Sequence, residues 1–363
     1  MKAVGTKGKA LIAMSGGVDS SVAAKLTLDM GYDCIGCMMK LYDISDEGVI
    51  DGPNASRTCC SVDDAEDARS VAYRLGMPFY VFNFKDEFRQ QVIDRFIDSY
   101  LKGITPNPCI ECNRHLKFER LYQRALELGC DKIVTGHYAR IEYNGERYVL
   151  KKGLDASKDQ SYVLFRLTQE LLAHTLFPLG ALSKDESRQI AAENGFVNAS
   201  KPDSQDICFV PDGDYASVIE RYTGVKVPGG DFVDMSGKVL GRHKGIIHYT
   251  IRQRRGLGIS APEPLYVIAI DVRGNKVVLG PDEALFKREV FAADVNWIPG
   301  GDIPAEYRCL AKIRYHHREQ PGTLYADGDG LRFVFDEPQR AITPGQSLVL
   351  YDGDEVLGGG RII

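Results

Sequence analysis

The sequence predicts an α/β protein: an N-terminal doubly wound parallel sheet, then a small central α+β segment and a C-terminal β-barrel. Short apolar runs alternate with helical patterns up to residue 135, which is typical of a parallel sheet covered by helices. The first apolar run ends in a glycine-rich turn. Towards the C-terminus, short alternating segments are separated by Gly and Pro. We place the domains at 1–214, 215–282 and 283–363.

The N-terminal elements follow from these runs in chain order. Each apolar run precedes a segment with helical spacing that ends near a glycine, as helices often do. The predicted strands are 9–14, 33–41, 79–82 and 131–135, and the predicted helices are 19–30, 63–75, 85–101 and 113–129. In such a sheet, ligands bind beyond the carboxyl ends of the strands. We therefore expect the turns after these strands to meet in one crevice.

Later elements are less regular. The Asn144-Gly145 turn predicts a hairpin over 141–150. We expect residues 158–195 to be helical, and a small all-β barrel from about residue 265. Its expected strands are 266–271, 276–279, 308–315, 331–335 and 347–351.

Composition limits the class of protein. The chain has 363 residues, of which 44% are hydrophobic and 26% charged, which is enough for a folded core. No apolar run approaches the roughly 20 residues needed to cross a bilayer, and the N-terminus does not fit a signal peptide. The nine cysteines are an odd number. We therefore expect reduced thiols and a cytoplasmic location.

The charge distribution favours a polyanionic partner more than the total does. The net charge is −5, yet residues 241–260 and 308–318 carry several Lys and Arg and no acid. Charge alone leaves two interpretations open, a nucleic-acid surface and ordinary solvated loops.

The stretch Ser15-Gly16-Gly17-Val18-Asp19-Ser20-Ser21 carries the clearest chemical signal. Glycines allow a ligand to approach the backbone, and the N–H groups at the start of a helix bind anions. The stretch lacks the lysine of a Walker A loop and is not a G-x-G-x-x-G turn. It resembles the pyrophosphate loop of N-type ATP pyrophosphatases. The resemblance implies ATP-binding at Ala13, Met14, Ser15, Gly16, Gly17, Val18, Asp19 and Ser20, with Met39 and Gly136 at neighbouring strand ends.

Three cysteines lie in two irregular segments: Cys109 and Cys112 in a C-x-x-C motif, and the distant Cys208. Half a zinc site or a thioredoxin-type site would use the same spacing, but no second metal-binding pair accompanies it, and a thioredoxin motif fits only loosely. We expect Cys34, Cys37 and Cys130 to be buried apolar residues.

A series of motifs in chain order identifies the family that the sequence resembles. After Ser-Gly-Gly-Val-Asp-Ser come 105–113 (TPNPCIECN), 135–140 (TGHYAR), 158–162 (KDQSY), 203–209 (DSQDICF) and 343–346 (TPGQ). Together they resemble the bacterial-type tRNA-specific 2-thiouridylases, and the resemblance covers nearly the whole chain. That family is a sulfurtransferase family that thiolates C2 of the wobble uridine (position 34) of tRNA.

The resemblance implies a mechanism. Uridine O2 is adenylated by ATP, with Mg²⁺ and Asp19 near the released pyrophosphate. Cys208 carries the incoming sulfur as a persulfide supplied by a donor protein that the sequence does not name. Cys112 is the second catalytic cysteine and ends in a disulfide with Cys208. Sulfur transfer of this kind needs a thiolate that attacks a sulfur–sulfur bond.

The resemblance also assigns residues to the anticodon stem-loop and the target base. They are Asn107, Pro108, Cys109, His137, Lys158, Asp159, Gln160, Arg314, Tyr315 and Gln346. Many relatives carry Asp at the position of Cys109. The extra thiol raises an alternative in which Cys109, Cys112 and Cys208 hold a [4Fe–4S] cluster for the same reaction. Cys59 and Cys60 are extra relay sites or incidental thiols.

Two other functions compete with thiolation. Another adenylating enzyme, such as an amide-forming synthetase, would need neither Cys112 nor Cys208. A non-enzymatic nucleotide- or RNA-binding redox module would release no pyrophosphate from ATP in the presence of tRNA.

Overall fold

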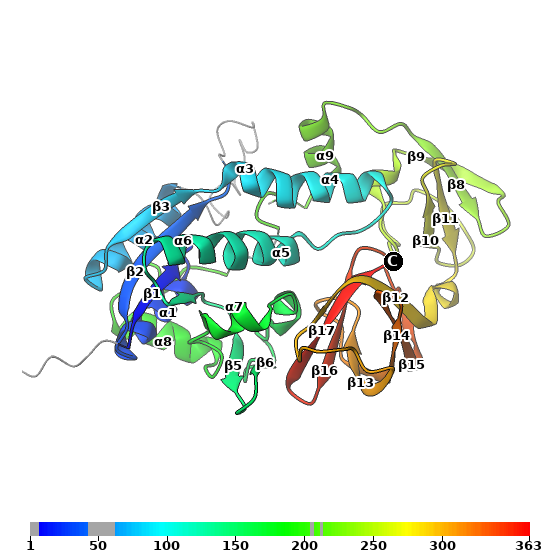
Figure 1. Ribbon diagram of the computed structural model, residues 1–363. Coiled ribbons are helices and arrows are strands. Elements are labelled where there is room, and N and C mark those ends of the chain that lie inside the picture. The colour runs from blue at the N-terminus through cyan, green and yellow to red at the C-terminus, as the bar shows by residue number, and fades with distance from the viewer. Residues whose placement is uncertain (1–6, 43–61, 204–206, 211–212) are drawn as a thin grey trace, which may run out of the picture.

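The computed structural model describes residues 7–42, 62–203, 207–210 and 213–363. Within these ranges, the N-terminal domain holds a parallel sheet of five strands in the order β3-β2-β1-β4-β7 (Figure 1). The strands are β1 (Lys9–Ala13), β2 (Asp33–Lys40), β3 (Phe79–Asn83), β4 (Lys132–Val134) and β7 (Thr175–Leu176). The strand order reverses between β1 and β4, and such a switch point is where doubly wound sheets bind ligands. The predicted doubly wound sheet is confirmed.

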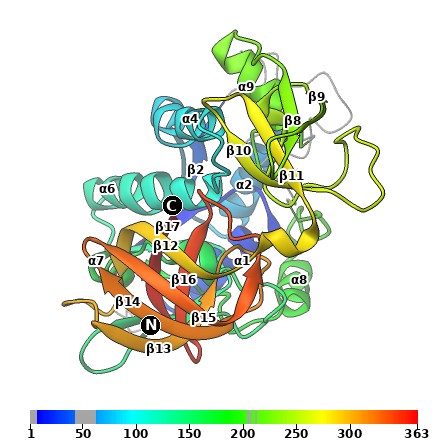
Figure 2. The same cartoon turned by 90° about the vertical axis from the view of Figure 1, so that its right-hand side faces the viewer.

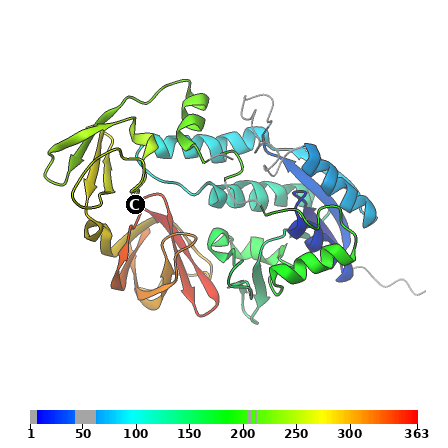
Figure 3. The same ribbon diagram turned by 180° about the vertical axis from the view of Figure 1, so that it is seen from behind.

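Helices cover both faces of this sheet, because the buried side chains of its strands point alternately to one face and the other. Leu11 of β1 packs into one hydrophobic cluster, whereas Ala10 and Ile12 pack into another on the opposite face. The helices are α1 (Val18–Asp29), α2 (Val62–Arg74), α3 (Lys85–Phe88), η2 (Arg89–Ile93), α4 (Asp94–Leu101), α5 (Pro108–Glu111), η3 (Cys112–Arg120), α6 (Leu121–Glu127) and α8 (Lys184–Glu193). Segments α3-η2-α4 and α5-η3-α6 run on as two long helices, side by side in Figures 1 and 3.

The prediction that residues 158–195 are helical throughout was wrong. The stretch contains the short η4 (Ser161–Leu164) and α7 (Gln169–Ala173), then strand β7, before α8 begins. Thr168 caps α7, and Ser183 forms a capping box with Glu186 at α8, so new helices start where one was expected to continue. Between them, Gly180 lies so close to Ala139 that a Cβ on Gly180 would meet the carbonyl oxygen of Ala139.

A second sheet forms the middle of the chain. It has four strands in the part described, in the order β10-β11-β8-β9, and helix α9 (Tyr215–Thr223) precedes it. The strands are β8 (Gly230–Asp234), β9 (Val239–His243), β10 (Tyr266–Asp271) and β11 (Lys276–Gly280), with short turns η5 (Ile246–His248) and η6 (Asp282–Leu285). Assigning 266–271 and 276–279 to the barrel was therefore wrong. Alternation marks a half-buried strand but does not specify its partner, and here β11 pairs with β8.

The third sheet closes into an antiparallel barrel (Figure 2). In the fully described stretch 286–362, six strands run in the order β12-β15-β14-β13-β16-β17, and β12 pairs with β17 to close it. They are β12 (Phe286–Trp297), β13 (Glu306–Lys312), β14 (Gln320–Asp327), β15 (Gly330–Arg340), β16 (Ser347–Asp352) and β17 (Glu355–Ile362). The predicted C-terminal barrel is confirmed. The predicted hairpin, β5 (Ala139–Tyr143) with β6 (Tyr148–Lys152), adds to this sheet through β17.

Buried polar contacts join the barrel to the N-terminal domain. Arg166, whose side chain is 5% exposed, donates to the backbone carbonyl and the carboxylate of Asp294 in β12. Arg114 also reaches that carboxylate, at 3.4 Å. Burial lowers the pKa of Arg166 and Asp294 opposes this, so the acid keeps the buried guanidinium charged. Across the described part of the chain, every helix is too short or too polar to span a bilayer.

We predict that Asp294→Ala lowers the free energy of unfolding by about 1–2 kcal/mol, because it removes a charged hydrogen-bond acceptor from the buried Arg166. Thermal unfolding measures the change. Asp329→Ala, in the exposed turn between β14 and β15, is the matched control and should have no effect. Equal stability of the two variants would contradict the assignment.

Candidate nucleotide and thiol site

The turn between β1 and α1 is held in shape by its own serines. The backbone N–H of Ser15 donates to the hydroxyl of Ser20 at 3.1 Å, and the hydroxyls of Ser20 and Ser21 each donate to the carbonyl of Gly17 at 3.1 Å. The N-cap residue of α1 is Gly17, which has no side chain to cap the first turn, so the N–H groups of that turn can bind an anion. We call residues 14–20 the phosphate loop.

Two glycines bring neighbouring elements against the phosphate loop. Gly16 has φ +74°, and a Cβ there would lie 2.4 Å from the carbonyl oxygen of Asp64 in α2. At the end of β4, a Cβ on Gly136 would lie 2.8 Å from the backbone of Asp19. The predicted meeting of the first and fourth strand ends is therefore present. Met39, near the end of β2, is half-buried against the adjoining core.

Lys184, which the sequence patterns did not reveal, connects the phosphate loop to Asp203, in the thiol-bearing segment that leads to Cys208. The ammonium of Lys184 lies 2.7 and 2.9 Å from the two carboxylate oxygens of Asp19 and 2.7 Å from Asp203. The hydroxyl of Tyr138 also donates to Asp19, at 2.8 Å. The capping box at Ser183 predicts a helix start, but no local pattern pairs Lys184 with residues so distant in sequence.

Asp203 gathers further cations. Its carboxylate lies 2.9 Å from Lys158 and 3.2 Å from Arg188, in addition to Lys184. Burial raises the pKa of Asp203, but hydrogen bonds from Lys184 and Lys158 outweigh it, so the net shift is downward. The acid is therefore ionised at neutral pH. Lys158, a predicted tRNA contact, is thus close to the thiol-bearing segment.

The neighbouring predicted tRNA contacts bind protein backbone. The Asp159 carboxylate accepts from the N–H of Gly153 at 3.0 Å, and the Gln160 amide oxygen accepts from the N–H of Tyr138 at 3.0 Å. In the barrel, the Tyr315 hydroxyl donates to the carbonyl of Asp159 at 3.3 Å. These contacts bring 158–160 and Tyr315 together.

Two further predicted residues extend from the barrel. The Gln346 amide donates to the carbonyl of Thr105 at 3.0 Å, beside Asn107 and Pro108. Burial raises the pKa of Tyr315, and Asp159 and Cys109 add to the shift. Arg314 donates to the carbonyl of Arg340 at 3.1 Å.

His137 lies apart from this group. Its ring is 7% exposed and contacts the rings of Phe118 and Phe177. The Thr135 hydroxyl is 2.7 Å from its Nδ1, and burial holds the pKa of His137 well below its usual value. A contact between this neutral ring and RNA stays a prediction.

The C-x-x-C motif begins a helix. The Asn107 side chain accepts from the N–H of Cys109 at 3.2 Å, and Pro108 occupies the first helical position. Cys109 is exposed, whereas Cys112 is half-buried against the large core cluster.

Cys208 packs against that same cluster. Its carbonyl accepts from the Tyr42 hydroxyl at 2.7 Å, and the next residue, Phe209, contacts the rings of Phe88 and Phe96. Tyr42 and Phe209 therefore anchor the backbone at Cys208 and directly after it.

The remaining described N-terminal thiols are buried, as predicted. Cys34, Cys37 and Cys130 are all at most 3% exposed. Burial raises the pKa of the Cys34 thiol to about 12, and it raises the pKa of the other two as well. Cys59 and Cys60 lie outside the described residues.

Family models match nearly the whole chain. A "tRNA methyl transferase HUP domain" matches residues 8–212, a "tRNA methyl transferase PRC-barrel domain" matches 216–281, and an "Aminomethyltransferase beta-barrel domain" matches 287–362. A protein of Clostridioides difficile named tRNA-specific 2-thiouridylase MnmA is 52% identical, and the alignment covers 98% of both chains. The chain belongs to the tRNA-specific 2-thiouridylase family. Proteins of the same name from Acetivibrio thermocellus and Carboxydothermus hydrogenoformans are 50% and 47% identical, over 98% and 100% of this chain and 99% of each relative.

The described residues of this 2-thiouridylase-family chain offer few ligands to a metal ion. Among the described residues, no three His, Cys, Asp or Glu side chains gather as a ligand set. Cys109, Cys112 and Cys208 thus do not form a cluster site in this conformation. Asp19 offers a single carboxylate that Lys184 already binds, so Mg²⁺ at this position would have to compete with the ammonium.

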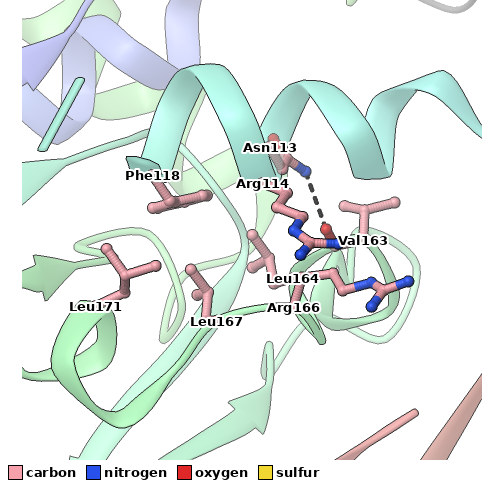
Figure 4. Close-up of a pocket in the computed structure, with 8 residues that line it drawn as sticks. All are labelled: Asn113, Arg114, Phe118, Val163, Leu164, Arg166, Leu167 and Leu171. Carbon is pink, nitrogen blue, oxygen red and sulfur yellow. Dashed lines mark hydrogen bonds between the residues drawn. The ribbon is translucent and has the colours of Figure 1, made fainter. Parts of the chain in front are cut away.

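A small hollow elsewhere in the family's N-terminal domain is not this site. It lies between η3 and the segment from η4 to α7, has a volume of about 10 Å³ and is largely apolar. Figure 4 shows its lining residues and the hydrogen bond from Asn113 to the carbonyl of Val163. The phosphate loop does not contribute to it, so we assign it a packing role.

We predict that Gly16→Ala weakens ATP binding at least tenfold and destabilises the fold, because its Cβ collides with Asp64 and its φ is positive. Gly31→Ala is the matched control: Gly31 has φ +90°, but nothing lies within 4 Å of its Cβ position. Titration of ATP and thermal unfolding separate the collision from the backbone strain. Similar ATP affinity in both variants would show that the close approach is unimportant.

Proposed function

We propose that the chain uses ATP to replace O2 of the wobble uridine of tRNA with sulfur. Family membership supports this activity, and one observation supports a shared site for ATP and sulfur. Lys184 joins Asp19 of the phosphate loop to Asp203, which lies five residues before Cys208 in the sequence. The proposal does not depend on the identity of the donor protein or on the set of tRNAs.

The first step is adenylation of the base. Uridine O2 attacks the α-phosphorus of ATP, an O–P bond forms, and the bond to pyrophosphate breaks. The N–H groups of α1 and the glycine-rich backbone of the phosphate loop would hold the departing pyrophosphate. Mg²⁺, when bound, would supply additional positive charge to the phosphates. O2 becomes part of a good leaving group, AMP.

The second step transfers sulfur. We assign Cys208 the role of persulfide carrier and Cys112 that of nucleophile. The terminal persulfide sulfur bonds to C2 while AMP leaves. The Cys112 thiolate attacks the Cys208 sulfur, which breaks the bond to the transferred sulfur and leaves a Cys112–Cys208 disulfide. The persulfide sulfur is reduced as the two cysteines are oxidised, and an external thiol restores them.

The target base must leave its stack for this chemistry. We propose that Asn107, Pro108 and Cys109 contact the base. The contacts of Tyr315 with Asp159, and of Gln346 with Thr105, support a tRNA surface that includes Lys158, Gln160 and Arg314. His137 remains the least supported member, because it is buried.

The basic segment 241–260 lies within the proposed central domain, 215–282, and would bind the tRNA backbone. Such contacts make affinity fall with salt. We place the enzyme in the cytoplasm, with a persulfide-carrying protein as its sulfur donor.

We predict that Cys208→Ser and Cys112→Ser each abolish tRNA thiolation, because either change removes a sulfur from the transfer sequence. Cys208→Ala should still release pyrophosphate when ATP and unmodified tRNA are present. Cys130→Ser, a buried thiol in the same domain, is the control. Mass spectrometry of the tRNA nucleosides and a pyrophosphate assay measure the two steps. Full thiolation by both variants would contradict the roles assigned to the two cysteines.

We predict that protein purified anaerobically without iron still thiolates tRNA when a persulfide donor is supplied. Iron and acid-labile sulfide analyses, with absorbance, establish the cluster content. Activity that appears only after cluster reconstitution would overturn the persulfide relay and favour a cluster on the three cysteines.

A further inference from the structure

The segment Asn198–Asp203 lies between α8 and the Cys208 residue, and it contacts the nucleotide site at three points. We propose that Asn198 is a positioning residue that couples the phosphate loop to the placement of Cys208. The role of this coupling in catalysis rests on the proposed function, whereas the contacts are present in the structure itself.

The first contact is a pair of hydrogen bonds from the buried side-chain amide of Asn198. Asn198 is 2% exposed, and its Nδ2 donates to the carbonyl of Gly16 and to the hydroxyl of Ser21, both at 2.9 Å. Its Oδ1 is buried and accepts no hydrogen bond from the described residues. The two donations by Nδ2 offset the cost of this unsatisfied buried acceptor. Those donations fix the carbonyl of the loop and the first turn of α1.

The second contact binds α2, the helix that packs against the phosphate loop at Gly16. The ammonium of Lys201 lies 2.7 Å from a carboxylate oxygen of Asp64 and 2.7 Å from one of Asp67, both in α2. The Asp64 carbonyl is the group that leaves no room for a side chain on Gly16. Burial lowers the pKa of Lys201, but the two acids outweigh it and the net shift is upward, so the lysine stays charged.

The third contact is the ion pair of Asp203 with Lys184, which also binds Asp19. The segment is therefore attached to the backbone before Asp19, to α2 beside the loop, and to Asp19 itself. Beyond it, Tyr42 and the phenylalanine rings around Phe209 anchor the Cys208 region. A displacement of Gly16 or Asp19 upon phosphate binding must be accommodated by this segment.

Asn198 is not part of any motif that the sequence analysis singled out. The contact joins residues 182 positions apart, and only the fold brings them together. Hydrogen bonds of a buried amide are short-ranged and directional, which makes them suited to transmit small backbone shifts.

The test compares Asn198→Ala and Asn198→Asp with Asn194→Ala. Asn194, at the end of α8, bonds within its own helix and is the matched control. Reduced protein is treated with iodoacetamide, with and without a non-hydrolysable ATP analogue, and alkylation of Cys208 is followed by mass spectrometry. The assay needs neither tRNA nor a sulfur donor.

We expect the analogue to change the alkylation rate at Cys208 at least threefold in the original protein and in Asn194→Ala, but not in Asn198→Ala. The KM for ATP should rise about fivefold to tenfold in Asn198→Ala, the loss typical of buried hydrogen bonds. It should rise further in Asn198→Asp, which adds a charge that repels phosphate and the Gly16 carbonyl. Asn198→Ser serves if the alanine variant fails to fold, as judged by thermal unfolding.

Alkylation that is insensitive to the analogue in the original protein, or still sensitive in Asn198→Ala, overturns the coupling. Failure of the original protein to thiolate tRNA when ATP and a persulfide donor are supplied would instead overturn the proposed function and leave the alkylation result standing.

Discussion

The shared ammonium of Lys184 is the interaction on which the arrangement of the site depends. A half-buried carboxylate in a phosphate loop is unfavourable beside an incoming polyanion, unless a cation lies between them. Lys184 supplies that cation, and it binds a second acid from the segment that leads to Cys208. Removing the lysine would take the ammonium away from Asp19 and leave Asp203 with only Lys158 and Arg188. The phosphate loop and the thiol segment are thus held in one electrostatic network.

The barrel contributes side chains that contact two segments of the N-terminal domain. Gln346 reaches the backbone just before Asn107, and Tyr315 reaches Asp159. The ion pair between the buried guanidinium of Arg166 and Asp294 of β12 stabilises this position of the barrel. The barrel therefore contacts the backbone that leads to Asn107, and the base contact proposed for 107–109 would depend on the position of the barrel.

The sequence predicted the elements whose signal is local. The strands that end at Ala13 and Val134 are continuous apolar runs, and the phosphate loop is a dense glycine–serine pattern, so both were identified correctly. Strand β7 escaped because two residues carry no periodicity, and β10 and β11 were misassigned because alternation does not specify a partner strand. Lys184 and Asn198 were missed for a related reason: their partners lie 165 to 182 positions away.

The hairpin β5–β6 belongs by sequence to the N-terminal domain, yet it extends the sheet of the barrel through β17. Arg140 and Arg147 bind Asp354 and Glu355 across this junction. A fragment that ended before β12 would lack these acids and would leave the hairpin with an open edge, and exposed strand edges promote aggregation. We therefore expect the N-terminal domain to need the barrel for its solubility, and fragments made for expression should include both.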